Sequence, residues 1–234
     1  MGDLAGGRVV LAVHGTRSRD GQAVSAALRD AVAARLDGVT VQLGWADVLE
    51  PPLVRTLEET GACVLVPVFM TVGYHVAYDL PKAVRDSGGR AVVTPHVGDA
   101  ILDAVVERLA EVDTDPEAVV LGAAGSLRPG SVAEVVAAAA RLASILGCPV
   151  TPGFVTSAQP TVAEAVAALR AAGYGRVSVA SYFLAPGVLP GRLDRAGADV
   201  VARPVGVHPL LVDAIVDRYV ATLPTVHGRP TGTP

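Results

Sequence analysis

Short apolar runs alternate with longer amphipathic segments along this chain, and the two periodicities predict alternating strands and helices. Runs such as Val9-Val-Leu-Ala-Val13 are continuously apolar, which is typical of strands covered on both faces in a parallel sheet. The predicted strands are 8–13, 39–45, 63–69 and 91–94, then 118–123, 149–155, 176–183 and 199–203. The predicted helices are 21–36, 51–60, 76–86 and 99–111, then 131–146, 160–172, 190–196 and 208–222. This order predicts an α/β protein.

The second half of the chain repeats the first. The segment Val10-Leu-Ala-Val-His-Gly-Thr-Arg17 returns as Val120-Leu-Gly-Ala-Ala-Gly-Ser-Leu127, with alanine in place of the histidine. Phe69-Met-Thr-Val-Gly73 likewise returns as Phe183-Leu-Ala-Pro-Gly187. We therefore expect two tandem, duplicated domains, each with a parallel four-stranded sheet flanked by helices. They are predicted at 1–112 and 118–222, followed by a disordered tail at 223–234.

Composition and charge exclude several function classes. The only lysine, Lys82, follows a proline, so no Walker A loop is present, and no Gly-x-Gly-x-x-Gly fingerprint opens a helix after a strand. We therefore expect no nucleotide cofactor. A net charge of −4 does not favour a nucleic-acid or membrane partner. The sequence begins without a signal-peptide pattern, and its longest apolar stretches are shorter than a membrane span, which predicts a cytoplasmic protein.

Three metal-ligating residue types follow three successive strands of the first half. His14 ends the first strand, Asp47 follows the second, and His75 follows the third. Carboxyl ends of parallel strands share one edge of the sheet, where ligands collect, so these side chains are predicted to converge. Imidazole and carboxylate suit a divalent first-row metal, and neutral imidazole also accepts protons. The corresponding positions of the second half are not comparable ligands: Ala124, Thr156 and Leu189.

Each of these residues also has a structural interpretation. A single histidine at a strand end is more often a structural residue or a cap than a ligand, and an aspartate after a strand is often a turn or N-cap residue. The joint loss of all three in the second half favours the functional interpretation. The other histidines carry less weight: His96 is a loop residue or a support for the ligands, His208 a structural residue, and His227 lies in the tail.

The turn after His14 offers a candidate site for binding carboxylates. Thr16, Arg17 and Arg19 lie between the first strand and the following helix, where backbone N–H groups and guanidinium groups can bind anions. An ordinary solvated loop is an equally good interpretation of this segment.

Two motifs resemble the class II chelatases of tetrapyrrole biosynthesis, the sirohydrochlorin chelatases that insert cobalt or iron without ATP. They are His-Gly-Thr-Arg-Ser-Arg-Asp-Gly at 14–21 and Phe-Met-Thr-Val-Gly-Tyr-His-Val-Ala-Tyr-Asp-Leu-Pro at 69–81, and the likeness extends over about 8–222. It implies a macrocycle bound between the halves and a metal-binding, proton-accepting pair at His14 and His75. Asp47 falls where relatives commonly carry a glutamate that helps to hold the metal, and Tyr74 is an insertion before the second histidine.

The resemblance implies an enzyme that inserts Fe²⁺ or Co²⁺ as a substrate into sirohydrochlorin, for siroheme or cobalamin biosynthesis. Because both halves are fused, a monomer suffices for one site. Two alternatives remain open at this point: a non-catalytic carrier of metal or tetrapyrrole, and a metal-dependent hydrolase. A carrier binds the same cargo without accelerating insertion. The hydrolase is the weaker alternative because the chain lacks a dense motif such as His-Glu-x-x-His.

Overall fold

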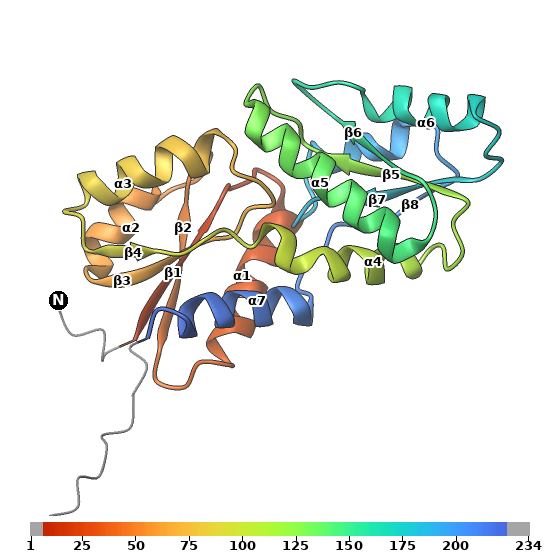
Figure 1. The fold of residues 1–234 in the computed structure, drawn as a ribbon. Helices are drawn as coiled ribbons and strands as arrows, with labels where there is room; N and C mark the ends of the chain where they lie inside the picture. The colour runs from red at the N-terminus through yellow and green to blue at the C-terminus, as the bar shows by residue number, and fades with distance from the viewer. Residues whose placement is uncertain (1–6, 224–234) are drawn as a thin grey trace, which may run out of the picture.

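A computed structural model describes residues 7–223, which form two parallel four-stranded sheets (Figure 1). The first sheet has the order β2-β1-β3-β4, with β1 (Arg8–Val13), β2 (Thr40–Trp45), β3 (Cys63–Pro67) and β4 (Ala91–Val93). The second has the order β6-β5-β7-β8, with β5 (Ala118–Ala123), β6 (Val150–Phe154), β7 (Val177–Ser181) and β8 (Val200–Val201). Two sheets with the same order of successive strands confirm the predicted duplicated α/β fold. Apart from Leu223, the predicted tail 223–234 lies outside the described residues, as does His227.

The helices follow the predicted order. They are α1 (Arg19–Ala33), α2 (Leu53–Thr60), α3 (Leu80–Asp86), α4 (Leu102–Ala110), α5 (Pro129–Leu146), α6 (Val162–Ala171) and α7 (Pro209–Val220). Three predicted helical segments differ in type. The segment before α3 begins as a π-helix, η1 (His75–Asp79), α4 is preceded by the 3₁₀ turn η2 (Gly98–Ile101), and the predicted helix 190–196 is the 3₁₀ segment η3 (Pro190–Arg195). Apolar periodicity does not distinguish these tighter or wider turns from an α-helix.

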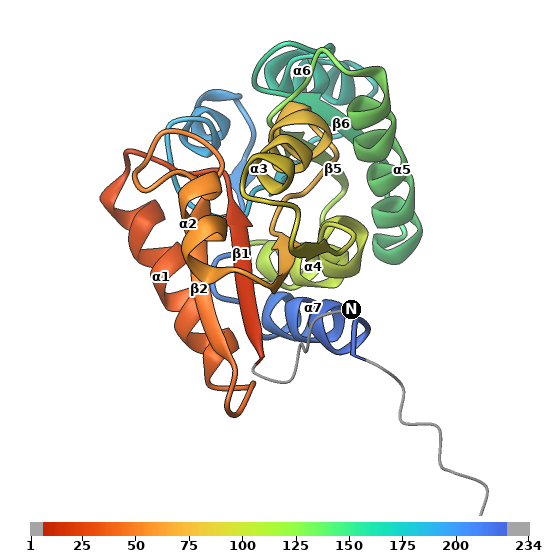
Figure 2. The ribbon, with the colours of Figure 1, turned by 90° about the vertical axis from the view of Figure 1, so that its left-hand side faces the viewer.

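The last helix of each half packs on the sheet of the other half. On one face of the first sheet, α2 and α3 cover Val10 and Ala12. On its other face, α1 and the C-terminal α7 cover Val9 and Leu11, whereas α4 packs against β7 and α5 (Figures 1 and 2). Because of this exchange, one core cluster runs through both halves. The boundaries 1–112 and 118–222 describe the sequence repeat and stay a prediction as independent folding units.

Within the described chain, α5 is the one helix long and apolar enough, by length and composition, to cross a membrane. Helices of a protein core can have the same length and composition, and α5 buries Val135, Ala138 and Leu142 in the shared core.

A charged cluster fastens the end of α4 to the second half. Arg203 donates to both carboxylate oxygens of Glu111, at 2.7 and 2.9 Å, and Arg108 donates to the same carboxylate at 2.5 Å. Arg108 also donates to the carbonyl of Val205. The hydrogen bonds from Arg203, and then those from Arg108, lower the pKa of Glu111 from 4.5 to about 2.

We expect Glu111→Gln to be less stable than the parent at neutral pH, by about 1 kcal/mol after allowance for solvent screening of this exposed group. A carboxyl whose pKa is lower in the folded state stabilises the fold above pH 4.5 and loses that contribution as the pH falls toward 2. The difference between the two proteins should therefore vanish in acid. Urea unfolding at pH 7 and near pH 2 measures it, and an unchanged difference at both pH values would contradict this account.

Candidate metal centre

Three adjacent strands position the candidate ligands. Because β1 lies between β2 and β3 and all three run parallel, their carboxyl ends share one edge. His14 directly follows β1, Asp47 follows β2 after one residue, and His75 opens η1 beyond β3. The histidine of the central strand is therefore flanked by the other two ligands.

A glycine fixes the distance between the first two loops. Gly15 adopts a φ of +94°, and a Cβ there would lie 2.2 Å from the carbonyl oxygen of Asp47. Only glycine tolerates both the left-handed backbone and this approach. The Asp47 N–H then donates to the carbonyl of His14 at 2.9 Å. The sequence His-Gly is thus what allows the aspartate loop to lie against the histidine loop.

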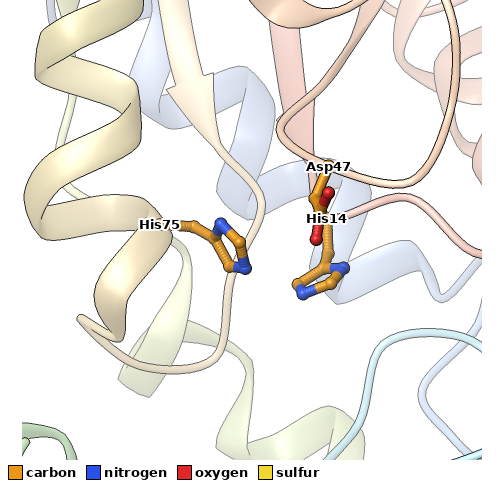
Figure 3. A group of neighbouring side chains, drawn as sticks. All are labelled: His14, Asp47 and His75. Carbon is orange, nitrogen blue, oxygen red and sulfur yellow. The ribbon is translucent and has the colours of Figure 1, made fainter.

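The structure brings the three side chains together. One ligand atom from each of His14, Asp47 and His75 lies within 4.8 Å of the others (Figure 3). The centres of the two imidazole rings are 4.4 Å apart, and the ring planes are inclined at 84°. His14 and Asp47 are exposed, whereas His75 is half-buried. Two imidazoles and a carboxylate at this spacing are a donor set for a first-row divalent metal, with an open side from which a substrate can approach.

Hydrogen bonds orient both imidazoles the same way. Nδ1 of His75 contacts Oδ2 of Asp79 at 2.6 Å, and Nδ1 of His14 contacts the Gly15 carbonyl at 3.1 Å. Carbonyl and ionised carboxylate oxygens only accept, so Nδ1 carries the proton in each neutral ring. Nε2 of each ring then keeps its lone pair for a metal. A carboxylate behind a metal-binding histidine also fixes the orientation of its ring.

Asp79 lies within the motif at 69–81, but its contact with His75 was not predicted from the sequence. The signal was present: Asp79 stands four residues after His75, which places the two side chains on one face of a helix. The predicted helix started at 76, one residue too late to include the histidine, whereas η1 begins at His75 itself.

The second half repeats this backbone without the ligands. Gly125 has a φ of +90°, and the Thr156 N–H donates to the carbonyl of Ala124 at 2.9 Å, just as Asp47 does to His14. The Thr156 hydroxyl donates to the same carbonyl at 2.7 Å. Within residues 7–223, the group of His14, Asp47 and His75 is the one cluster of three such side chains. The fold is therefore shared, and the donor set belongs to one half.

The other described histidines have structural contacts. His208 is buried, and its Nδ1 accepts from the Leu210 N–H at the start of α7, in agreement with the structural role expected for it. Nδ1 of His96 contacts the Phe69 carbonyl at 3.3 Å, and its Nε2 lies 3.8 Å from Glu134. Both histidines lie apart from the ligand cluster.

In the turn after His14, two hydroxyl groups already accept hydrogen bonds from the backbone. The Thr16 hydroxyl accepts from the Ser18 N–H at 3.1 Å, and Ser18 caps α1 by accepting from Gly21. Arg17 is exposed in this turn, and Arg19 is exposed as the first residue of α1. The two guanidinium groups therefore remain candidates for substrate carboxylates, whereas the Thr16 side chain stabilises the turn.

The carboxyl edges of the two sheets face each other. Next to the turn after β1, a Cβ on Gly21 would lie 2.6 Å from the carbonyl oxygen of Pro186, which follows β7. Across the other side, the Arg128 guanidinium lies 5.0 Å from the centre of the Tyr78 ring, one helical turn beyond His75. Leu127 and Val188, beside these contacts in the second half, are 87% and 75% exposed. The face opposite the ligands thus combines a cation with exposed apolar side chains, which no pattern in the sequence indicated.

The family model of CbiX matches residues 8–112 and again residues 118–222. Among curated proteins, none is significantly similar in sequence. Similar solved structures include SirB from Bacillus subtilis with Fe³⁺, which is 23% identical with a TM-score of 0.75, over 91% of this chain and 94% of that one. The sirohydrochlorin chelatase SirB from Bacillus subtilis subspecies spizizenii, in complex with cobalt, is 21% identical with a TM-score of 0.75, over 92% and 94%.

A third similar structure is CbiX, described as the terminal enzyme for siroheme biosynthesis in denitrifying bacteria. It is 23% identical with a TM-score of 0.69, over 93% of this chain and 100% of that one. At these identities the likeness shows the fold. The family match covers most of the chain and occurs once in each repeat, as the resemblance to class II chelatases predicted, and the chain therefore belongs to the CbiX family.

Proposed function

We propose that this protein inserts Fe²⁺ or Co²⁺ into sirohydrochlorin without ATP, for siroheme or cobalamin biosynthesis. The observation that carries the proposal is the group of His14, Asp47 and His75 at the sheet edge that faces the second half. The family and the solved relatives, which include a sirohydrochlorin chelatase with cobalt and SirB with Fe³⁺, support the same reaction. A cytoplasmic location, no nucleotide cofactor and no nucleic-acid or membrane partner belong to this proposal.

In the proposed reaction, the two imidazoles accept the two protons that the macrocycle loses. Nε2 of His14 and of His75 hold the divalent metal, and Asp47 offsets its charge. As the metal passes to the four pyrrole nitrogens, both Nε2–metal bonds break. Each released lone pair takes one proton from the two pyrrole N–H groups, which leaves two imidazolium ions and a metallated macrocycle. The hydrogen bond to Asp79 keeps the His75 ring oriented while its Nε2 accepts the proton.

Both halves contribute to the proposed binding of the macrocycle. Its peripheral carboxylates need cations although the chain carries a net charge of −4, and Arg17 and Arg19 supply them beside His14. Arg128 supplies another from the opposite side, and exposed Leu127 and Val188 offer apolar contact to the macrocycle face. Thr16 remains part of this proposed site through the turn that it shapes.

Asp47 is proposed as the third ligand, and its length is testable. One oxygen already accepts from the Val48 N–H at 2.7 Å, which leaves the other for a metal. We expect Asp47→Ala to weaken Co²⁺ binding about tenfold or more, and Asp47→Glu to keep it, because the carboxylate is retained with a longer reach. Calorimetric titration with Co²⁺ measures both. If both variants bind like the parent, Asp47 is only a turn residue.

The reaction itself is tested by absorbance. Purified protein is mixed with metal-free sirohydrochlorin and Fe²⁺, Co²⁺ or Ni²⁺ in the absence of ATP, and the initial rate is compared with the reaction without protein. The proposal predicts acceleration with Fe²⁺ or Co²⁺. A protein that binds the macrocycle or the metal but leaves the rate unchanged would be a carrier, and the proposal would be wrong.

A further inference from the structure

Residues 70–72, in the segment that leads from β3 to His75, are held by three contacts from the second half of the chain. Oε2 of Glu134, on α5, accepts from the Val72 N–H at 2.8 Å. One turn earlier on the same helix, the Ser131 hydroxyl donates to the Thr71 hydroxyl at 2.9 Å. The Tyr182 hydroxyl, just after β7, contacts the Met70 carbonyl at 3.4 Å. The three residues that precede Gly73 are therefore fastened from across the molecule.

His96, from the first half, contacts both this segment and Glu134. Its Nδ1 contacts the Phe69 carbonyl, and its Nε2 lies 3.8 Å from the same Glu134 oxygen that holds Val72. The ring fits there because position 98 is glycine: a Cβ on Gly98 would lie 2.3 Å from Cε1 of His96. The side chains of His96 and Glu134 are only 20% and 33% exposed. Together they contact both ends of the segment 69–72.

The internal repeat shows that this contact is special to the half with the ligands. In the repeat, Val72 corresponds to Pro186, since Tyr182 and Val68 donate to equivalent positions on β5 and β1. Proline has no N–H, so the segment after β7 cannot donate this hydrogen bond. The residue of α1 that corresponds to Glu134 is Val24, which cannot accept one. The second half lacks counterparts of the three ligands, having Ala124, Thr156 and Leu189 instead. The contact between Val72 and Glu134 likewise has no counterpart in the repeat.

We propose that Glu134 is a positioning residue for His75. Its carboxylate fixes Val72, three residues before the histidine, and so holds His75 opposite His14. The bond joins a side chain of the second half to the backbone just before η1, which suits it to anchoring this loop. The second half, which lacks the ligands, thereby sets the geometry of the metal centre. This inference rests on the proposed function, because it assigns Glu134 a role at the proposed metal site.

The test uses Co²⁺ binding to the full chain without tetrapyrrole. Glu134→Ala should weaken Co²⁺ affinity about tenfold, whereas Glu134→Gln should stay within about threefold, because its amide oxygen still accepts from Val72. The matched control is Glu164→Ala, which removes the capping box of α6 in the same half. It should lower Tm but leave Co²⁺ affinity unchanged. This contrast separates a positioning role from a general loss of stability.

Parent-like Co²⁺ affinity in Glu134→Ala would overturn the inference, as would an equal loss in Glu134→Gln, since charge and not the hydrogen bond would then be responsible. If Glu134→Ala does not fold, Ser131→Ala carries the same test: weaker affinity supports the inference and unchanged affinity overturns it. Substitution of His14 or His75 in the same assay separates failure of the positioning role of Glu134 from failure of the proposed metal site. If these variants also bind like the parent, the proposed metal site itself has failed.

Discussion

Replacement of either His14 or His75 by alanine is expected to lower the rate of metal insertion by at least about 100-fold. Each variant removes one of two Nε2 ligands and one of two acceptors for the pyrrole protons. Stability should change by no more than about 0.5 kcal/mol, because His14 is exposed and neither ring belongs to the core. Initial insertion rates and urea unfolding of the same preparations measure both effects.

The matched control is His208→Ala. His208 is buried and caps α7, so its loss should lower stability by about 1 kcal/mol while the insertion rate is kept. The His14 and His75 variants should thus lose insertion rate but not stability, and the His208 variant should lose stability but not rate. A metal site on the surface of an intact fold requires this contrast. Near-parent rates in both His14→Ala and His75→Ala would remove the basis for the proposed site.

Asp79→Ala is expected to lower Co²⁺ affinity and insertion rate about 10- to 100-fold, although Asp79 is not a proposed ligand. Without the carboxylate, Nδ1 of His75 loses its acceptor, and the ring is free to rotate or to place its proton on Nε2. Asp79→Asn should recover part of the affinity, because its amide oxygen still accepts the hydrogen bond but carries no charge. Co²⁺ calorimetry and insertion rates of the two variants give the comparison.

Asp86→Ala serves as the control for this second prediction. Asp86 is exposed on α3, the helix that directly follows η1, and it pairs with Lys82. Its removal changes the charge near Asp79 without removing a contact to His75. It should bind Co²⁺ like the parent. If Asp79→Ala does the same, the contact between Asp79 and His75 has no role in metal binding.

The duplicated fold could be predicted because short segments of the sequence carry the strand and helix patterns. Val9 to Val13 and Val119 to Leu121 are continuously apolar, and these strands are indeed buried on both faces. The common edge for His14, Asp47 and His75 followed from the parallel strands alone. The exchange of α4 and α7 between the halves could not be predicted, because both helices present similar apolar faces and either sheet would bury them.

The supports of the site were also beyond the sequence. Glu134 is far from Val72 along the chain, and Arg128 is far from Tyr78, so their contacts arise only when the halves pack together. The internal repeat nevertheless held a usable signal, since a glutamate stands where the first half has Val24, and Val72 stands where the second half has Pro186. Such asymmetric pairs become informative once the structure shows that they meet.

A single-turnover experiment tests the central claim most directly. Protein loaded with one equivalent of Co²⁺ and freed of excess metal is mixed with metal-free sirohydrochlorin, and the absorbance of the macrocycle is followed without ATP. The account predicts that the bound Co²⁺ enters the macrocycle faster than free Co²⁺ at the same concentration, and that the double variant His14→Ala, His75→Ala loses this advantage. Transfer no faster than from free Co²⁺, or an equal rate in the double variant, would contradict it.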